Sequence, residues 1–165
     1  MWLIGMMGSG KTTCGGAAAL QVGVPFFDTD RMVVELARIP IPTIWEGVGE
    51  EGFRRLEARA IADVPGSGFI AAAGGGAVMA PENREHMARG GPVVWLRCHP
   101  EVLARRVDGG DARPILEGAK SVIDVLTKLL DERSPLYEEV ATDVVETDRL
   151  DVADVVAAII EIWQR

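Results

Sequence analysis

The chain has few of the residues that build disulfide frameworks or metal centres. Among its 165 residues are two cysteines, Cys14 and Cys98, and two histidines, His86 and His99. No Cys-x-x-Cys spacing occurs, so we expect two buried thiols in a reducing compartment, although the count alone also permits one disulfide. Because neighbours in a strand point to opposite faces, the adjacent Cys98 and His99 do not suit a shared metal ion.

Positive charge and long apolar runs are also scarce. Lysine and arginine total 17 against 25 aspartates and glutamates, a formal net charge of -8. This balance argues against nucleic-acid binding over a broad face, and an anionic substrate would need a local basic pocket. No apolar run reaches the roughly 18–20 residues of a membrane helix, and residues 1–4 lack the basic start of a signal peptide. We therefore expect a cytoplasmic protein without membrane or nucleic-acid partners, and its small size favours a monomer.

The composition that is present suits one compact domain. Hydrophobic residues make up 48% of the chain and charged residues 25%, which excludes a disordered protein. The 19 glycines follow no three-residue period, so a collagen-like chain is excluded as well. No linker or change of composition divides the sequence, and its length is that of a single domain.

Short apolar runs alternate with amphipathic stretches along the chain. Strands are predicted at residues 1–4, 24–27, 68–72, 92–96 and 143–146. Helices are predicted at residues 12–22, 30–38, 50–63, 100–107, 119–133, 136–142 and 152–163, with another opening at Pro81. Residues 39–48, with Pro40 and Pro42, are expected to be irregular, and residues 108–118 to form a loop. The alternation predicts one α/β domain with about five parallel strands and helices on both faces.

The clearest motif is Gly5-Met6-Met7-Gly8-Ser9-Gly10-Lys11-Thr12, which fits the P-loop pattern G-x-x-x-x-G-K-[ST]. It follows a predicted strand and opens a predicted helix, so backbone N–H groups and the helix N-terminus can bind phosphate. Lys11 can reach the β- and γ-phosphates, and the Thr12 hydroxyl can hold Mg²⁺. The motif predicts binding of a nucleoside triphosphate or diphosphate. Since no Asn-Lys-x-Asp stretch is present to bind guanine, a GTPase is disfavoured.

Two carboxylates follow the second predicted strand in Asp28-Thr29-Asp30. In a parallel sheet the carboxyl ends of the strands face the edge that carries the phosphate loop. One carboxylate could hold a Mg²⁺-bound water, and the other could accept a proton from an attacking hydroxyl. The alternative is that an aspartate only caps the helix that begins near Arg31.

Six motifs in this order make the chain resemble the shikimate kinase family. They are the P-loop, Asp28-Thr29-Asp30, Gly49-Glu50-Glu51-Gly52-Phe53-Arg54-Arg55-Leu56-Glu57, Gly74-Gly75-Gly76-Ala77, Arg113-Pro114-Ile115-Leu116 and Arg133-Ser134-Pro135-Leu136-Tyr137. The resemblance covers nearly the whole chain. It implies a three-layer α/β/α fold like that of nucleoside monophosphate kinases, with strand order 2-3-1-4-5. It also implies a single kinase domain over residues 1–165, a substrate-binding region at about 29–63 and a mobile lid at about 108–118.

The activity that the resemblance implies is transfer of the γ-phosphate of ATP to the 3-hydroxyl of shikimate, with Mg²⁺, in aromatic amino-acid biosynthesis. Asp30 would contact the shikimate hydroxyls and act as the base or orienting group. Arg54 and Arg133 would bind the shikimate carboxylate, since a planar guanidinium donates two parallel hydrogen bonds. Gly75 and Gly76 would offer backbone groups to the ring hydroxyls.

On the nucleotide side, the resemblance implies that Asp28 supports Mg²⁺ together with Thr12. Arg113 would close over the phosphates with the lid, where it would act in catalysis beside Lys11, and Arg106 would lie by the adenine. The remaining implied nucleotide contacts are Gly8, Ser9, Gly10 and Thr13.

Simpler interpretations of the same residues stay open. Arg54 and Glu57 could form a solvated helix pair, Arg133 could interact with a helix C-terminus, Arg113 could be an exposed loop charge, and the glycine triplet could be only a turn. The chain also departs from the family pattern. Trp45 stands where the family has phenylalanine, Pro40 and Pro42 stiffen that region, and only Arg149 is basic in residues 147–151.

Two other functions compete with phosphorylation of shikimate. One is a related kinase of gluconate or a nucleoside monophosphate, because gluconate also carries a carboxylate and hydroxyls. The other is a nucleotide-binding regulatory protein without catalysis. The joint presence of Lys11, Thr12, Asp30 and Arg113 favours an enzyme.

Overall fold

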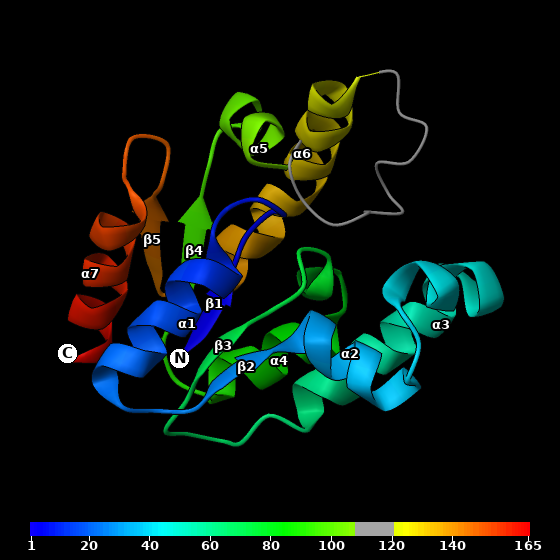
Figure 1. Ribbon diagram of the computed structural model, residues 1–165, viewed down its shortest axis with the longest axis horizontal. Coiled ribbons are helices and arrows are strands. Elements are labelled where there is room, and N and C mark those ends of the chain that lie inside the picture. The colour runs from blue at the N-terminus through cyan, green and yellow to red at the C-terminus, as the bar shows by residue number, and fades with distance from the viewer. Residues whose placement is uncertain (108–120) are drawn as a thin grey trace.

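A computed structural model describes residues 1–107 and 121–165 and contains a five-stranded parallel sheet (Figure 1). The strands are β1 (Trp2–Ile4), β2 (Phe26–Asp28), β3 (Ile70–Ala72), β4 (Val93–Arg97) and β5 (Asp143–Glu146). Their order in the sheet is β2-β3-β1-β4-β5, which confirms the predicted architecture. In the central strand, Trp2 pairs with Ala71 of β3 on one side and with Val93 of β4 on the other.

The helices enclose the sheet on both faces (Figure 1). They are α1 (Lys11–Val22), α2 (Thr29–Ala37), α3 (Ile41–Ala62), α4 (Pro81–Arg89), α5 (Pro100–Val107), α6 (Val122–Val140) and α7 (Val152–Trp163), with a short 3-10 helix η1 (Ala77–Met79). Helices α1 and α7 pack on one face, and α4, α5, α6 and the second half of α3 pack on the other. No described helix is long and apolar enough to cross a membrane.

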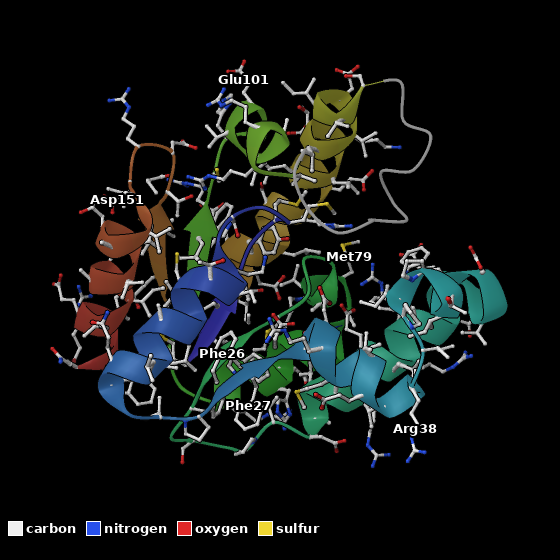
Figure 2. The ribbon with its side chains drawn as sticks, in the orientation of Figure 1. Phe26, Phe27, Arg38, Met79, Glu101 and Asp151 are labelled. Atoms are coloured by element: carbon white, nitrogen blue, oxygen red, sulfur yellow. The ribbon has the colours of Figure 1, made fainter. Side chains whose placement is uncertain are left out.

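The apolar residues of the strands divide between two cores because successive side chains point to opposite faces. Trp2 and Ile4 belong to the core under α4 and α6, whereas Leu3 belongs to the core under α1 and α7. The same division holds in β2, where Phe26 packs on the second core and Phe27 on the first (Figure 2). Burial on both faces explains why the strand sequences are almost continuously apolar.

The prediction that residues 39–48 are irregular is wrong, because α3 already begins at Ile41. Proline is tolerated in the first helical turn, where its missing N–H would have no partner. Here Pro40 is the N-cap and Pro42 lies at the helix start. Gly49, with φ 68° and ψ -175°, breaks the helical path and separates residues 41–48 from the predicted helix. Val33, Ile44, Phe53 and Ala60 form a small third core between α2 and α3.

The prediction of two helices at residues 119–133 and 136–142 is also wrong. From Val122 to Val140 the chain forms one helix, α6, with Pro135 inside it. A proline inside a helix costs about 3 kcal/mol. Burial of Leu126, Tyr137 and Val140 along one side of α6 offsets that cost. Residues 108–118, predicted as a loop and lid, fall within the undescribed segment 108–120.

Candidate active site

The carboxyl ends of the strands open into a cavity of about 1440 Å³. Several segments of the chain meet there, and the predicted nucleotide residues that line it are Gly8, Ser9, Gly10, Lys11, Thr12, Thr13 and Arg106. The predicted substrate residues that line it are Asp30, Arg54, Gly75, Gly76 and Arg133. The fold therefore places nearly all the predicted site residues around one cavity. Arg113 lies outside the described residues.

The phosphate loop requires glycine at two positions for different reasons. A Cβ on Gly5 would lie 2.6 Å from the Leu96 carbonyl oxygen, so the loop can leave β1 only without a side chain there. Gly10 has φ 96° where α1 begins, a conformation that side chains disfavour. Lys11 is buried, and its Nζ donates to the carbonyl oxygens of Gly5 and Met6 at 2.9 Å each. The lysine therefore braces the loop while it lines the cavity.

Asp28 caps α2 and also contacts the phosphate loop. One carboxylate oxygen accepts from the Arg31 backbone N–H at 3.2 Å and caps α2, so Asp28 rather than Asp30 is the N-cap. The other accepts from the Thr12 hydroxyl at 2.7 Å. A hydroxyl and a carboxylate in contact are hard oxygen donors of the kind that Mg²⁺ prefers. These two residues fit a magnesium site beside the phosphate loop.

Asp30 lies in the first turn of α2 and faces the end of β3. A Cβ on Gly74 would lie 2.8 Å from one Asp30 carboxylate oxygen and 2.5 Å from one of Glu57. The Gly74 N–H donates to the Thr29 hydroxyl at 2.9 Å, which ties the glycine triplet to α2. Two carboxylates thus approach the same glycine, as only a residue without a side chain allows.

Arg54 and Glu57 form a partly buried ion pair rather than a solvated one. The Arg54 guanidinium lies 2.7 Å from Glu57 and 3.2 Å from Glu50, and only 1% of the Glu57 side chain is exposed. Burial raises the pKa of Glu57, while the charge of Arg54 opposes that rise. A Cβ on Gly76 would lie 2.4 Å from an Arg54 nitrogen, so the guanidinium rests against the glycine triplet.

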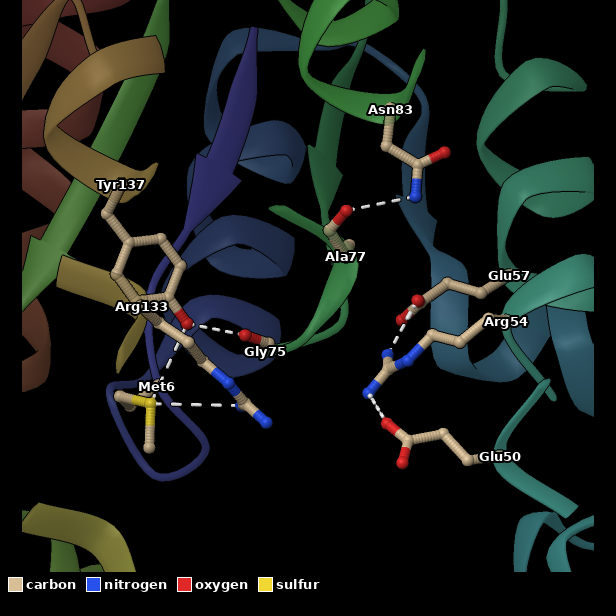
Figure 3. A network of polar contacts seen from close by, with 9 residues as sticks. All are labelled: Met6, Glu50, Arg54, Glu57, Gly75, Ala77, Asn83, Arg133 and Tyr137. Carbon is tan, nitrogen blue, oxygen red and sulfur yellow. Dashed lines mark hydrogen bonds and ion pairs between the residues drawn. The ribbon is translucent and has the colours of Figure 1, made fainter. Parts of the chain in front are cut away.

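Arg133 reaches the same space from the opposite side (Figure 3). It lies within α6 and is 5% exposed, so its predicted alternative as a partner of a helix C-terminus is wrong. One guanidinium nitrogen lies 4.0 Å from the Met6 sulfur and 3.6 Å from the Cβ position of Gly75. Figure 3 shows the guanidinium groups of Arg54 and Arg133 pointing toward each other across the cavity. Two converging cations suit a carboxylate.

The other end of the cavity has an apolar wall and an anchored arginine. Arg106 donates to the Thr147 carbonyl at 2.7 Å and to its hydroxyl at 3.2 Å. Leu150, Val152 and Val155 line the cavity nearby. The next residue after Thr147, Asp148, accepts from the His99 N–H at 2.7 Å, which lowers its pKa and ties this segment to the start of α5. A flat apolar ring such as a nucleobase suits this end.

Sequence reasoning missed two buried members of the site. Glu57 was considered only as a surface partner of Arg54, and Tyr137 only as part of a motif. Helical periodicity could have marked Glu57 as internal, because it places Glu57 on the buried face of α3. No local signal could have shown that the Tyr137 hydroxyl contacts Gly75, because that contact joins residues 62 positions apart.

Trp45, which stands where the family has phenylalanine, packs against Phe53 with ring centroids 5.5 Å apart.

The buried Glu57 predicts a pH-dependent cost for removing its cation. In Arg54→Gln we expect the pKa of Glu57 to rise further. Burial and the charge of Asp30 both raise this pKa, and Arg133 is then the charge that still opposes the rise. A carboxyl whose pKa is higher in the folded than in the unfolded state gains stability as pH falls toward the unfolded value. The drop in Tm relative to wild type should therefore be larger at pH 8 than at pH 5.5.

The matched control is Arg55→Gln. Arg55 pairs with Glu51 at 2.6 Å on the surface, where both side chains are more than half exposed. Its drop in Tm should be small and equal at the two pH values. Equal drops for Arg54→Gln at pH 8 and pH 5.5 would contradict the account of Glu57.

The fold and the cavity together define a class of protein. A parallel sheet with order 2-3-1-4-5 carries a P-loop at β1, two aspartates at the end of β2, and two arginines aimed into the cavity. This is the arrangement of a P-loop kinase with a small anionic acceptor. The gluconokinase of Sinorhizobium meliloti 1021 has the same fold, with TM-score 0.63 and 19% identity over 99% of this chain and 90% of that one.

Comparison with known proteins narrows the class. The family model described as shikimate kinase matches residues 7–164, and the chain belongs to that family. A shikimate kinase of Dechloromonas aromatica is 41% identical, covering 100% of this chain and 90% of that protein. Another, from Symbiobacterium thermophilum, is 43% identical, covering 96% of this chain and 92% of that protein. The structure of shikimate kinase from Acinetobacter baumannii in complex with shikimate is 33% identical, with TM-score 0.92, and covers 99% and 91% of the two chains.

Proposed function

We propose that the chain transfers the γ-phosphate of ATP to the 3-hydroxyl of shikimate. The observation that carries this proposal is the pair of guanidinium groups, Arg54 and Arg133, that converge in the same cavity as the phosphate loop. Shikimate is a compact carboxylate with three ring hydroxyls, so it offers an anion to the arginines and acceptors and donors to the glycine triplet. A monomer in the cytoplasm, where ATP is available, is our proposal for its working state.

The residues would divide the reaction between them. Arg54 and Arg133 hold the carboxylate and thereby fix the direction of the ring. Asp30, beside Gly74, orients the reacting hydroxyl and accepts its proton as the oxygen attacks phosphorus. Lys11 and the backbone N–H groups of the loop bind the phosphate oxygens, where negative charge develops in the transition state. We assign the same role, stabilising the charge on the phosphate oxygens, to Arg113, which lies outside the described residues.

Thr12 and Asp28 are the residues that would hold Mg²⁺. Their hydroxyl and carboxylate oxygens are 2.7 Å apart at the foot of the phosphate loop. A bound Mg²⁺ would supply charge neutralisation of the phosphate oxygens. Asp28 would keep its capping bond to Arg31 with or without Mg²⁺, so the orientation of its carboxylate is set by the fold.

A coupled assay of ADP release tests the proposal. We expect turnover with shikimate and ATP, and turnover at least about 10³-fold lower in kcat/KM with gluconate and with nucleoside monophosphates, because their shapes leave polar groups of the site unpaired. Preference for gluconate or a nucleotide would favour the competing kinase. Tight ATP binding with no acceptor used would favour the regulatory protein.

Replacing Arg54 by lysine should weaken shikimate selectively. Lysine keeps the positive charge but loses the planar fork, and a charge-assisted hydrogen bond is worth roughly 1.5–3 kcal/mol. We therefore expect Arg54→Lys to raise KM for shikimate roughly 10- to 100-fold, with KM for ATP near wild type. Steady-state kinetics with each substrate varied in turn measures both constants.

Arg55→Lys is the control, since Arg55 is the next residue and its side chain is 68% exposed. It should leave both Michaelis constants unchanged. If Arg54→Lys also left KM for shikimate unchanged, Arg54 would have to be removed from the substrate site.

A further inference from the structure

We propose that Tyr137 is a positioning residue that fixes the Gly75–Gly76 peptide so that its N–H faces the bound substrate. This inference rests on the proposed function, because the substrate it concerns is shikimate. Tyr137 lies on α6 and is fully buried, and its hydroxyl donates to the Gly75 carbonyl oxygen at 2.5 Å (Figure 3). Tyr137 is not among the described residues that line the cavity, so its effect would pass through the glycine triplet.

The three carbonyls of the glycine triplet are all held, but by different means. The Gly74 carbonyl accepts from the Ala77 N–H at 2.9 Å, and the Gly76 carbonyl accepts from the Met79 N–H at 3.0 Å. These two bonds belong to the turn into η1, which Asn83 anchors through the Ala77 carbonyl at 2.9 Å. Among the hydrogen bonds that these three carbonyls accept from the described residues, only that of the middle carbonyl, on Gly75, depends on a side chain. Tyr137 therefore controls the one peptide of the triplet that the local backbone leaves free to rotate.

Peptide geometry converts that bond into an orientation. In a planar trans peptide, the N–H points opposite to the C=O. With the Gly75 carbonyl directed to Tyr137 in α6, the Gly76 N–H points away from α6. Within the described residues, neither the Gly75 N–H nor the Gly76 N–H donates to another part of the chain. Both amides are thus available to an acceptor in the cavity that Gly75 and Gly76 line.

The Gly75–Gly76 peptide lies close to both arginines. The Cβ position of Gly75 lies 3.6 Å from an Arg133 nitrogen, and that of Gly76 lies 2.4 Å from an Arg54 nitrogen. A rotated peptide would therefore turn a carbonyl dipole toward the place where the substrate carboxylate and hydroxyls are bound. Glycines have no side chain to resist such a rotation. The Tyr137 hydroxyl supplies the restraint that the glycines lack.

Burial keeps the hydroxyl a donor. It raises the pKa of Tyr137, so the phenol stays protonated at neutral pH. The ring packs against Trp95 with centroids 5.4 Å apart, and the hydroxyl lies 3.7 Å from the Met6 sulfur. Phenylalanine can occupy the same space, so Tyr137→Phe removes the hydrogen bond with little change in packing.

The test compares Tyr137→Phe with wild type in both kinetic constants. A net hydrogen bond is worth about 0.5–1.5 kcal/mol, so we expect KM for shikimate to rise roughly three- to tenfold. We expect KM for ATP to stay within about twofold, since the P-loop does not depend on this bond. A fall in Tm with both Michaelis constants unchanged would show a purely structural role and overturn the inference.

Thr142→Val is the matched control. The Thr142 hydroxyl bonds to the backbone of Val93 at 3.1 and 3.2 Å, at the edge of the sheet opposite the cavity. Its loss should lower Tm without moving KM for shikimate. A rise in KM for shikimate in Thr142→Val as large as in Tyr137→Phe would mean that general destabilisation causes the effect, and would overturn the inference.

A second measurement keeps the inference testable if Tyr137→Phe does not fold. Tyr137 is the chain's single tyrosine, so biosynthetic 3-fluorotyrosine labels this position alone. The labelled protein keeps the hydroxyl, and we expect its KM for shikimate to match wild type. Its ¹⁹F resonance should shift when shikimate is added and stay unchanged with gluconate. A ¹⁹F chemical shift that does not change at saturating shikimate would overturn the inference.

The two proposals fail in different ways. If unlabelled wild-type protein does not phosphorylate shikimate, the proposed function fails and the inference about Tyr137 falls with it. If wild type phosphorylates shikimate and Tyr137→Phe does so with the same KM, only the inference about Tyr137 fails.

Discussion

Asp30→Asn is expected to lower kcat by about 10²-fold or more while leaving the fold intact, because an amide cannot accept the proton of the attacking hydroxyl. The structure removes the main structural objection to this test. Asp28, not Asp30, caps α2 through the Arg31 N–H, so the substitution spares the helix start. Steady-state kinetics and a thermal melt on the same purified variant measure both quantities.

Glu51→Gln is a suitable control, because Glu51 is 89% exposed on α3 and pairs only with Arg55 among the described residues. It makes the same carboxylate-to-amide change and should leave kcat unchanged. If Asp30→Asn kept a normal kcat and lost only thermal stability, Asp30 would be a structural residue and another base would have to be sought.

Lys11→Ala is expected to lower turnover by about 10²–10³-fold or more while the protein still folds. The charge that Lys11 brings to the phosphate oxygens cannot be replaced by water in a closed site, and losing one such donor typically costs about 10²–10³-fold in rate. The structure adds a stability cost that the sequence did not suggest. Lys11 also donates to the Gly5 and Met6 carbonyls, which would lose a partner, so we expect a loss of about 1–3 kcal/mol.

Lys128→Ala provides the comparison for Lys11→Ala. Lys128 is 79% exposed on α6 and lies 3.9 Å from Glu132, so its removal should change neither rate nor stability appreciably. Near-native turnover of folded Lys11→Ala would contradict the assignment of the phosphate loop. Circular dichroism of both variants establishes that the comparison is between folded proteins.

Much of the fold could be predicted because its signals are local. The apolar strand β4 and the helix α7 have continuous patterns, and α7 begins with the Asp151 capping box, so their boundaries were nearly correct. The failures came where tertiary packing overrides local propensity. Pro135 stays inside α6 because the buried face of that helix continues to Val140. Pro40 and Pro42 begin α3 instead of preventing a helix.

The candidate site divides in the same way. The P-loop and Asp28-Thr29-Asp30 are short motifs, so their position at one edge of a parallel sheet followed from topology. The depth of each side chain did not. The sequence left open a solvated pair of Arg54 and Glu57, but Glu57 is 1% exposed, because its helix face packs toward β3 and the glycine triplet. Contacts between distant segments, such as Tyr137 with Gly75, depend on the packed structure and have no counterpart in a local pattern.

The most direct test of the account is to identify the product formed from shikimate and ATP. Phosphorus and proton NMR of the reaction mixture locate the transferred phosphate on the ring. We predict one phosphomonoester at the 3-oxygen of shikimate, formed in equal amount with ADP. Phosphate on another hydroxyl would contradict the proposed placement of the ring by Arg54 and Arg133. ADP with inorganic phosphate alone, and no phosphorylated shikimate, would contradict the assignment of the cavity as a shikimate site.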